Sequence, residues 1–361
     1  MFDLQNDGQK KRRSGKAFDI IIRAVATGIF ILSLFLNVVF IVIIIVMSLT
    51  IGAAKLKDVE KPGYKKVYMD SDYEASGWGD NELAVIGING IITDYDTNTG
   101  LFEYSENPVS AVKNRLDIIK KDKNIKGVLF VIDSPGGGIT ASDILYREIL
   151  KFKEETGLPI LTLMKQVAAS GAYYVASATD YILAYPTTIT GNIGVIMYYF
   201  NFNGLMDKYG VKYVAIKSSD HKDILSPFKG IDEKELMWMQ SIVDQMLEKF
   251  IEVIGEGRKN LTISEVRKLA DGRVYIAKDA LANGLIDEIG YFEDAVRVLS
   301  EKAGIERPGL IEYERERNLR DVLSWAVLNV KPGSFMDILD RDQNVKPYGM
   351  YFLWDSAALF N

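Results

Sequence analysis

The sequence predicts an α/β domain with a largely parallel sheet, preceded by a single membrane-spanning helix. Three observations lead to this fold class. Segments with strand and helix patterns alternate from position 82 onward. The short run Gly127–Ile132 is wholly apolar, which is typical of a strand buried on both faces. Before them, the 31 residues from Ala24 to Ala54 carry no charge.

The uncharged stretch is long enough to cross a bilayer, which takes roughly 20 apolar residues. No helix of a soluble domain stays apolar on every face for this length. A cleavable signal peptide is the competing interpretation, because Gly52-Ala53-Ala54 offers small residues, but its apolar region is usually only about 7–15 residues long. Positions 1–23 hold six basic and three acidic residues, which predicts a cytoplasmic N-terminus and an exported remainder.

We therefore expect a single-pass protein of the cell membrane with five parts. These are a basic cytoplasmic N-terminus (1–23), an anchor (24–54), a polar linker (55–80), a globular domain (81–300) and a C-terminal extension (301–361). Within the domain, apolar periodicity predicts the following elements in order: strand Glu82–Ile92, helix Asn107–Lys121, strand Gly127–Ile132, helix Ser142–Glu155, strand Pro159–Met164, helix Ser170 to about Thr179, strand Tyr181–Ala184, helix Asp232–Ile254, and short helices Thr262–Ala270 and Lys278–Asn283.

Composition excludes several classes of function. The chain has no cysteine, so thiol catalysis, disulfides and cysteine-bound metals are excluded. Its single histidine, His221, cannot form a multi-histidine metal site and leaves one candidate base for a Ser-His-Asp arrangement. The net charge is −6 and the first 23 residues sum to +3, so the remainder is near −9, which argues against a nucleic-acid partner. No cofactor site is expected. Met and Phe residues in Asp232–Ile254 fit core or subunit-interface packing better than a cofactor box.

Three segments carry residues capable of chemistry, and each has a plain structural alternative. The glycines of Asp133–Gly138 offer unobstructed backbone N–H groups for an oxyanion hole, or they form a flexible strand-to-helix turn. Ser170, flanked by small residues, is either a nucleophile or a helix N-cap. Lys222 is either a general base or a solvated surface charge, because a lysine acts as a base only when burial or nearby positive charge lowers its pKa.

Read together, the segments resemble the bacterial signal peptide peptidase A family. The similarity is carried by motifs in the order of that family and covers roughly residues 83–295: SPGGG (134–138), AASGAYY (168–174), TGNIGVI (190–196), IKSSDHKDILSP (216–227), ADGRVY (270–275) and ALANGLIDEIG (280–290).

The resemblance implies roles for individual residues. Ser170 is the expected acylated nucleophile and Lys222, in the HKD motif, the expected general base. Gly137 is expected to supply an oxyanion N–H group, whereas Lys217 and His221 are expected to be neighbours of the base. One position departs from the pattern, because Asn192 stands where the family usually has a serine that hydrogen-bonds the lysine. An amide oxygen still accepts a hydrogen bond from an amine but cannot relay a proton, so we expect Asn192 to orient the lysine at most.

The resemblance further implies a Clp protease/crotonase-like spiral of ββα units and a membrane-anchored serine endopeptidase. Its expected substrates are remnant signal peptides in the membrane, and its expected partners are the lipid bilayer and further copies of the chain, with serine and lysine contributed by adjacent protomers. Three alternatives stay open: a protease for other membrane-protein segments, a non-catalytic scaffold with Asn192 as a sign of lost activity, and a crotonase-like acyl-CoA enzyme. The apolar segment Tyr348–Trp354 either adds a strand to a protease groove or packs on its own surface.

Overall fold

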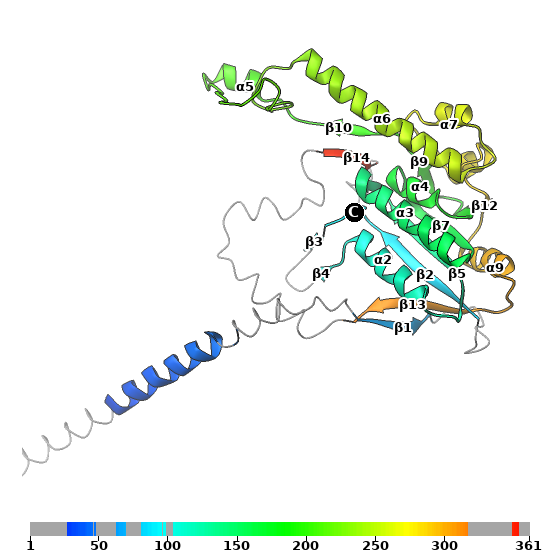
Figure 1. Ribbon diagram of the computed structural model, residues 1–361, viewed down its shortest axis with the longest axis horizontal. Coiled ribbons are helices and arrows are strands. Elements are labelled where there is room, and N and C mark those ends of the chain that lie inside the picture. Colours follow the sequence, from blue (N-terminus) through cyan, green and yellow to red (C-terminus); the bar gives the residue numbers. More distant parts are fainter. Residues whose placement is uncertain are drawn as a thin grey trace, which may run out of the picture. The chain divides into compact units, whose positions relative to one another are not determined.

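The computed structural model describes residues 27–45, 47, 63–69, 81–95, 97–98, 104–316 and 349–353. The chain divides into two compact units, one with the N-terminal apolar helix and one beginning at Tyr64 (Figure 1). The second, which we call the α/β unit, contains the described residues of 64–316 together with 349–353. The basic N-terminus expected over 1–23 and most of the linker expected over 55–80 lie outside the described residues.

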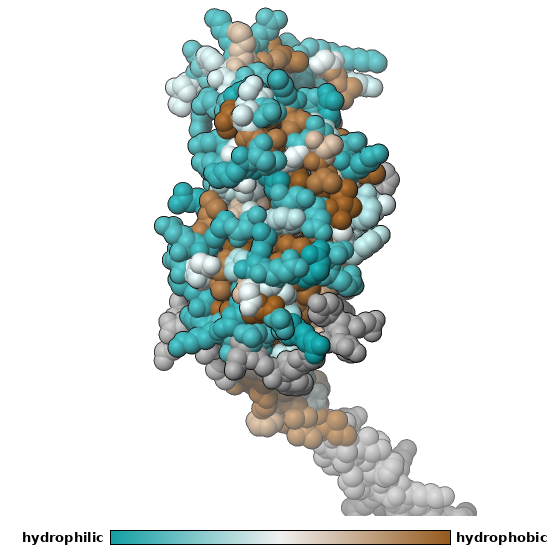
Figure 2. Space-filling view, turned by 90° about the vertical axis from the view of Figure 1, so that its right-hand side faces the viewer, coloured by the Kyte–Doolittle hydropathy of each residue, from teal (hydrophilic) through white to brown (hydrophobic). Residues whose placement is uncertain are grey.

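The N-terminal unit contains one helix, Thr27–Ile45, within the anchor expected over 24–54. It has 19 residues, a mean hydropathy of 3.0 and side chains that are all exposed, and its apolar surface is visible in Figure 2. Nineteen residues at 1.5 Å per residue match the thickness of a bilayer's hydrocarbon core. The length and composition of this helix therefore fit a membrane span.

The α/β unit is built on one large, mainly parallel sheet. Its main path runs in the order β1-β13-β2-β5-β7-β8-β12, and β9 and β11 continue from β7. Only the pairs β1–β13 and β9–β11 are antiparallel. The strands of this sheet are β1 (Tyr64–Tyr68), β2 (Glu82–Asn89), β5 (Ile125–Ser134), β7 (Ile160–Ala169), β8 (Tyr181–Ala184), β9 (Ile189–Gly191), β11 (Val274–Ile276), β12 (Glu288–Ile289) and β13 (Gly309–Arg315).

Two smaller sheets and eight helices complete the α/β unit as described. One small sheet has the order β10-β14-β6, with β6 (Gly136–Gly138), β10 (Ile196–Tyr198) and β14 (Gly349–Leu353), and the other pairs β3 (Thr97–Asn98) with β4 (Tyr104–Ser105). The helices are α2 (Pro108–Ile119), α3 (Ile139–Thr156), α4 (Gly171–Ala176), α5 (Asn203–Lys208), α6 (Glu233–Gly257), α7 (Ile263–Leu269), α8 (Ala277–Ala282) and α9 (Phe292–Ala303).

Helices cover the sheet on both faces, which explains why its central strands lack polar alternation. In β5, Val128, Leu129 and Phe130 are all fully buried. Val128 and Phe130 belong to the larger apolar cluster, which includes side chains of α2, α3, α4 and α6. Leu129 belongs to a second cluster with side chains of α9. Consecutive residues thus pack against opposite layers, as the apolar run in the sequence predicted.

The predicted elements are found with shifted ends, and the large sheet extends beyond residues 81–300. Strand β7 continues past the expected end at Met164 to Ala169, so that it leads directly into Ser170. At the sheet's edge, β1 lies in the segment expected to be linker and β13 in the expected C-terminal extension. Both strands are rich in charged residues because one face of an edge pair stays near solvent, so apolar periodicity gave little sign of them.

The segment between β10 and α6 differs from the rest of the unit because it packs little against the sheet. We call residues 199–231 the arm; it contains α5 and the turn with Lys222. In Figure 1 α5 and the start of α6 lie at the upper left, well separated from α4. Most residues of the arm are exposed, including many apolar ones. The face seen in Figure 2 is mainly hydrophilic, with apolar side chains in smaller groups.

Candidate active site

Ser170 occupies a sharp turn between a strand and a helix. It follows the last residue of β7 and precedes α4, with φ 53° and ψ −118°. Positive φ is uncommon for a residue with a side chain, and a strained strand-to-helix turn of this type carries the nucleophilic serine in other hydrolases. The turn is fixed by two backbone hydrogen bonds: Ser170 N–H donates to Gly191 O at 2.7 Å, and Tyr174 N–H donates to Ser170 O at 2.9 Å.

The Ser170 hydroxyl is buried and has no protein partner in the described part of the chain. The residue is 1% exposed, and Oγ is a buried polar atom without a hydrogen bond. Its side chain makes no N-cap bond to α4, so the alternative of a plain capping serine is not supported. A buried hydroxyl without a partner is unfavourable for stability, and such groups occur where chemistry requires them.

Two tyrosines that follow Ser170 anchor α4, and sequence reasoning gave them no role. The Tyr173 hydroxyl donates to Leu285 O at 2.7 Å, and the Tyr174 hydroxyl donates to Asp143 Oδ1 at 2.7 Å. Burial raises the pKa of Tyr173 and, together with the Asp143 carboxylate, that of Tyr174. Both hydroxyls therefore stay protonated donors that hold the helix. The signal in the sequence was two adjacent aromatic residues in the first turn of a short helix.

The glycine segment expected to form the oxyanion hole lies beside this turn. Ser134, at the end of β5, pairs in register with Ala168 of β7. Strand β6 follows Ser134 in the chain and contacts α4. Gly137 lies against Ile92, whose N–H donates to Gly136 O at 2.8 Å and whose carbonyl accepts from Gly138 N–H at 2.9 Å. A Cβ at Gly137 would come within 2.1 Å of Ile92 O, so no other residue fits here.

Asn192 lies next to the Ser170 turn and also has a positive φ, of 50°. Gly191, which precedes it, pairs in register with Ala169. The Asn192 side-chain amide donates to Gly272 O at 2.6 Å, and its backbone N–H donates to Arg273 O at 2.8 Å. Asparagine tolerates this left-handed conformation better than serine does. The backbone thus supplies a reason for asparagine at this position that is independent of any contact with a lysine.

Within one chain, Lys222 makes no hydrogen bond with the Ser170 hydroxyl. It lies in an exposed turn of the arm, and it makes no ion pair among the residues that the structure describes. The hydroxyl of Ser170 has no partner there either. The structure thus brings Ser170, Gly137 and Asn192 to one end of β5, β7 and β9, whereas Lys222 remains apart on the arm.

The apolar segment near the C-terminus, Tyr348–Trp354, contains a strand that lies beside the glycines of β6. Strand β14 lies between β6 and β10 and pairs antiparallel with both. Tyr351 is opposite Gly138 and Ile196, and Phe352 is opposite Gly137. The backbone edge of β6 therefore accepts an extended peptide by strand addition. Of the segment expected over 348–354, the first and last residues lie outside the described part.

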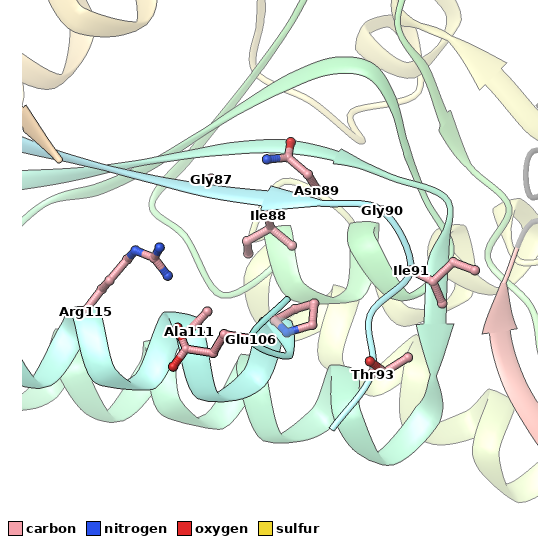
Figure 3. A pocket seen from close by; sticks show the side chains of 10 residues that line it. Gly87, Ile88, Asn89, Gly90, Ile91, Thr93, Glu106, Ala111 and Arg115 are labelled. Atoms are coloured by element: carbon pink, nitrogen blue, oxygen red, sulfur yellow. The ribbon is translucent and has the colours of Figure 1, made fainter. Parts of the chain in front are cut away.

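A separate pocket lies near the end of β2 and does not contain the nucleophile. It has a volume of about 330 Å³ and lies between the end of β2, the following loop and α2 (Figure 3). Ser170 is not among its lining residues. Its polar groups are engaged: Glu106 accepts from Tyr64 Oη at 2.7 Å and from Asn114 Nδ2 at 2.9 Å, while Arg115 Nε donates to Tyr313 O at 3.0 Å. These bonds connect β1, α2 and β13, which is a structural role.

Comparison with known proteins identifies the family. The profile of peptidase family S49 matches residues 152–306. The chain is 35% identical to a putative protease of Methanocaldococcus jannaschii over 242 residues, which are 67% of this chain and 77% of that protein. It is 37% identical to a putative signal peptide peptidase SppA of Enterococcus faecium over 240 residues, 66% of this chain and 69% of the relative. It is 32% identical to Protease 4 of Haemophilus influenzae over 219 residues, 60% of this chain and 34% of that protein.

These similarities agree with the geometry of the Ser170 turn and with the mixed α/β sheet. Family S49 has the Clp protease/crotonase-like fold, so the fold class and the family predicted from the motifs are both confirmed. The chain therefore belongs to peptidase family S49, a family of serine peptidases.

Proposed function

We propose that this protein is a membrane-anchored serine endopeptidase that cleaves peptides through an acyl-enzyme on Ser170, with Lys222 as general base. The observation that carries the proposal is the Ser170 hydroxyl: it is buried, strained at φ 53°, and without a partner among the described residues. A scaffold without activity would gain stability by relaxing such a turn. Because the strained turn is nevertheless present, it supports a catalytic protein rather than a non-catalytic scaffold.

The proposed reaction is an acyl transfer in two steps. Neutral Lys222 removes the Ser170 proton while Oγ attacks the peptide carbonyl carbon, and the N–H of Gly137 stabilises the oxyanion. The Lys222 ammonium then protonates the leaving amine, the C–N bond breaks, and an ester remains on Ser170. In the second step Lys222 takes a proton from water, hydroxide attacks the ester, and the peptide acid leaves as the proton returns to Ser170. Every proton removed by the lysine is thus returned within the cycle.

The separation of Lys222 from Ser170 supports a site shared between adjacent protomers. One chain leaves the nucleophile without a base and the lysine exposed on the arm. The arm also exposes a set of large apolar side chains, which a monomer in water would not favour: Phe200, Phe202, Leu205, Tyr209, Val211, Tyr213, Val214, Ile216, Phe228 and Ile231. Docking of the arm on a neighbouring copy would bury this surface and bring Lys222 to the neighbour's Ser170.

The proposed substrates are extended peptides at the membrane, including signal peptides left after preprotein cleavage. Strand β14 supports binding of an extended backbone beside Gly137. The apolar helix Thr27–Ile45 supports anchoring close to such peptides, with residues 1–23 in the cytoplasm and the α/β unit outside it. The name of the Enterococcus faecium relative points to the same substrate class. Within the site, Asn192 is proposed to orient Lys222 through its carboxamide oxygen, since its amide nitrogen already donates to Gly272.

The test is covalent labelling of the full-length protein in detergent with a fluorophosphonate probe. We expect wild type to be labelled, and Ser170→Ala and Lys222→Ala to lose labelling and peptide hydrolysis by about a hundredfold or more. Both variants must retain the assembly size of wild type, measured by light scattering. Mixing and reassembling the two inactive variants should restore part of the activity if protomers share the site. Labelling of Ser170→Ala at the wild-type level would overturn the proposal.

A further inference from the structure

The turn that carries Lys222 holds its own shape but makes no regular ladder with the large sheet. Short-range backbone bonds define it: Lys222 N–H donates to Ser219 O at 3.3 Å, Ile224 N–H to His221 O at 3.2 Å, and Ser226 N–H to Asp223 O at 2.9 Å. Such bonds fix a turn locally but leave its orientation relative to α6 open. A base must be held to within a fraction of an ångström to be effective, so side chains have to supply that orientation.

Four side chains of alternating charge, connected by ion pairs, supply this orientation. Lys217 Nζ donates to Asp223 Oδ1 at 2.7 Å, and Lys229 Nζ donates to the same oxygen at 3.1 Å. Lys229 also contacts Glu235 of α6, with Nζ to Oε2 at 2.7 Å. Glu235 is 3% exposed, and it lies in the first turn of α6, where the helix dipole favours a carboxylate. The pairs therefore connect the turn to the helix through a nearly buried end point.

The residue before Lys222 is tied to the same helix. His221 Nδ1 lies 3.3 Å from Glu235 Oε1, and the His221 ring packs edge-on against Trp238 with centroids 4.6 Å apart. Both sequence neighbours of Lys222 are thus held by α6, directly or through Lys229. The side chain of Lys222 is exposed and makes no ion pair among the described residues. This arrangement fits a base that is presented outward to another surface.

The network also keeps the carboxylates of Asp223 and Glu235, which lie near Lys222, paired with other lysines. Hydrogen bonds from Lys217 and Lys229 hold the pKa of Asp223 below its usual range, and the Lys229 ammonium holds the pKa of Glu235 below its own. Both carboxylates are therefore charged at neutral pH, and each is matched by a lysine. A free carboxylate adjacent to Lys222 would stabilise the ammonium form, which cannot accept a proton. With Lys217 and Lys229 bound to it, the Asp223 carboxylate is engaged elsewhere.

We propose that Lys217, Asp223, Lys229 and Glu235 form a positioning network that fixes the turn of Lys222 on α6 and keeps the Asp223 carboxylate from pairing with Lys222. The proposal rests on the proposed role of Lys222 as general base. It gives a function to Lys217, the second lysine of the motif, and to a buried carboxylate that the reaction itself does not use. The charged groups around the turn are these four, together with Asp220, His221 and Asp232.

The first test compares Lys229→Met with Lys234→Met in the full-length protein. Lys234 lies in the first turn of α6, next to Glu235, and makes no ion pair among the described residues, so its variant carries the same charge change without breaking the network. We expect Lys229→Met to lower kcat by about 10- to 100-fold with little change in KM, because substrate contacts are unaffected. In the double variant Lys217→Met/Lys229→Met, which removes both partners of Asp223, the labelling rate should rise at higher pH than in wild type, since Asp223 is then free to pair with Lys222. Lys234→Met should behave as wild type.

A second variant separates positioning from loss of structure. Asp223→Asn added to the Lys217→Met/Lys229→Met double variant removes the released carboxylate, so the pH profile should return toward that of wild type while kcat stays low. Lys229→Arg should keep both. If Lys229→Met fails to assemble, Lys217→Met, at the more exposed end of the network, should still lower kcat relative to Lys234→Met. Equal behaviour of Lys229→Met and Lys234→Met overturns the network, whereas full activity in Lys222→Ala overturns the base itself.

Discussion

Ser170 combines a strained backbone, near-complete burial and an unpaired hydroxyl. Its φ of 53° with ψ of −118° lies where glycine is favoured and a side chain costs about 1–3 kcal/mol. Neighbouring bonds from Gly191 and Tyr174 compensate for that cost by fixing the turn from both sides. The strain turns the hydroxyl out of the capping geometry that a serine at a helix start normally adopts. The Ser170 hydroxyl is thus left without a hydrogen bond among the described residues, because the turn prevents the usual capping interaction.

The strain predicts an unusual order of stabilities at this position. We expect Ser170→Gly to be more stable than Ser170→Ala by about 1 kcal/mol, because glycine adopts positive φ without the clash that alanine retains. That difference corresponds to roughly 2–4 °C in the unfolding temperature. Thermal unfolding of both full-length variants in detergent measures it. Ser177, at φ −64°, is the matched control, and there the alanine variant should be the more stable one. The same order at both positions would contradict strain at Ser170.

At the level of helices and strands, sequence patterns revealed some parts of the candidate site and missed others. Apolar periodicity located β5 and α3, and with them the glycine segment between them, because these elements bury a continuous apolar face. It missed β1 and β13, whose charged residues lie at an edge, and it gave no structure to the arm. The motifs identified Lys222 from resemblance alone. No pattern within one chain could have indicated where Lys222 sits relative to Ser170, because under the proposed sharing of the site that arrangement depends on what the arm packs against.

Strand β14 leads to a prediction about access to the groove. It pairs with β6 opposite Gly137, so a substrate that binds there as a strand, as proposed, has to replace it. A tethered competitor acts at an effective concentration in the millimolar range, which predicts about a tenfold gain in kcat/KM when it is removed. We expect this gain, mainly through a lower KM, for a variant that ends at residue 347. A variant that ends at Leu353 retains β14 and should match wild type. Equal kinetics for both truncations would show that β14 leaves the groove in the working enzyme.

At the scale of the whole molecule, the proposed shared site makes catalysis depend on where the arm docks. The exposed apolar side chains of the arm and Lys222 lie on one segment. A single contact would therefore bury these side chains and position Lys222. Burial of apolar surface contributes roughly 25 cal/mol per Å², so covering the large exposed side chains of the arm would stabilise such a contact. Under the proposed sharing of the site, assembly and activity would be one event, and a monomer would lack only the base.

Substitution of one arm residue should therefore remove activity without touching the catalytic groups. Ile216 has a relative exposure of 102%, so Ile216→Asp should leave the fold of the single chain intact while placing an unpaired charge in the contact. We expect smaller particles by light scattering in detergent, an unchanged circular dichroism spectrum, and a loss of fluorophosphonate labelling as large as that of Lys222→Ala. Ile216→Thr, which keeps a similar shape without charge, should assemble and retain most activity. A monomeric Ile216→Asp that is still labelled at the wild-type rate would show that one chain completes the site by itself, and Lys222 would then have to reach Ser170 by a movement of its own arm.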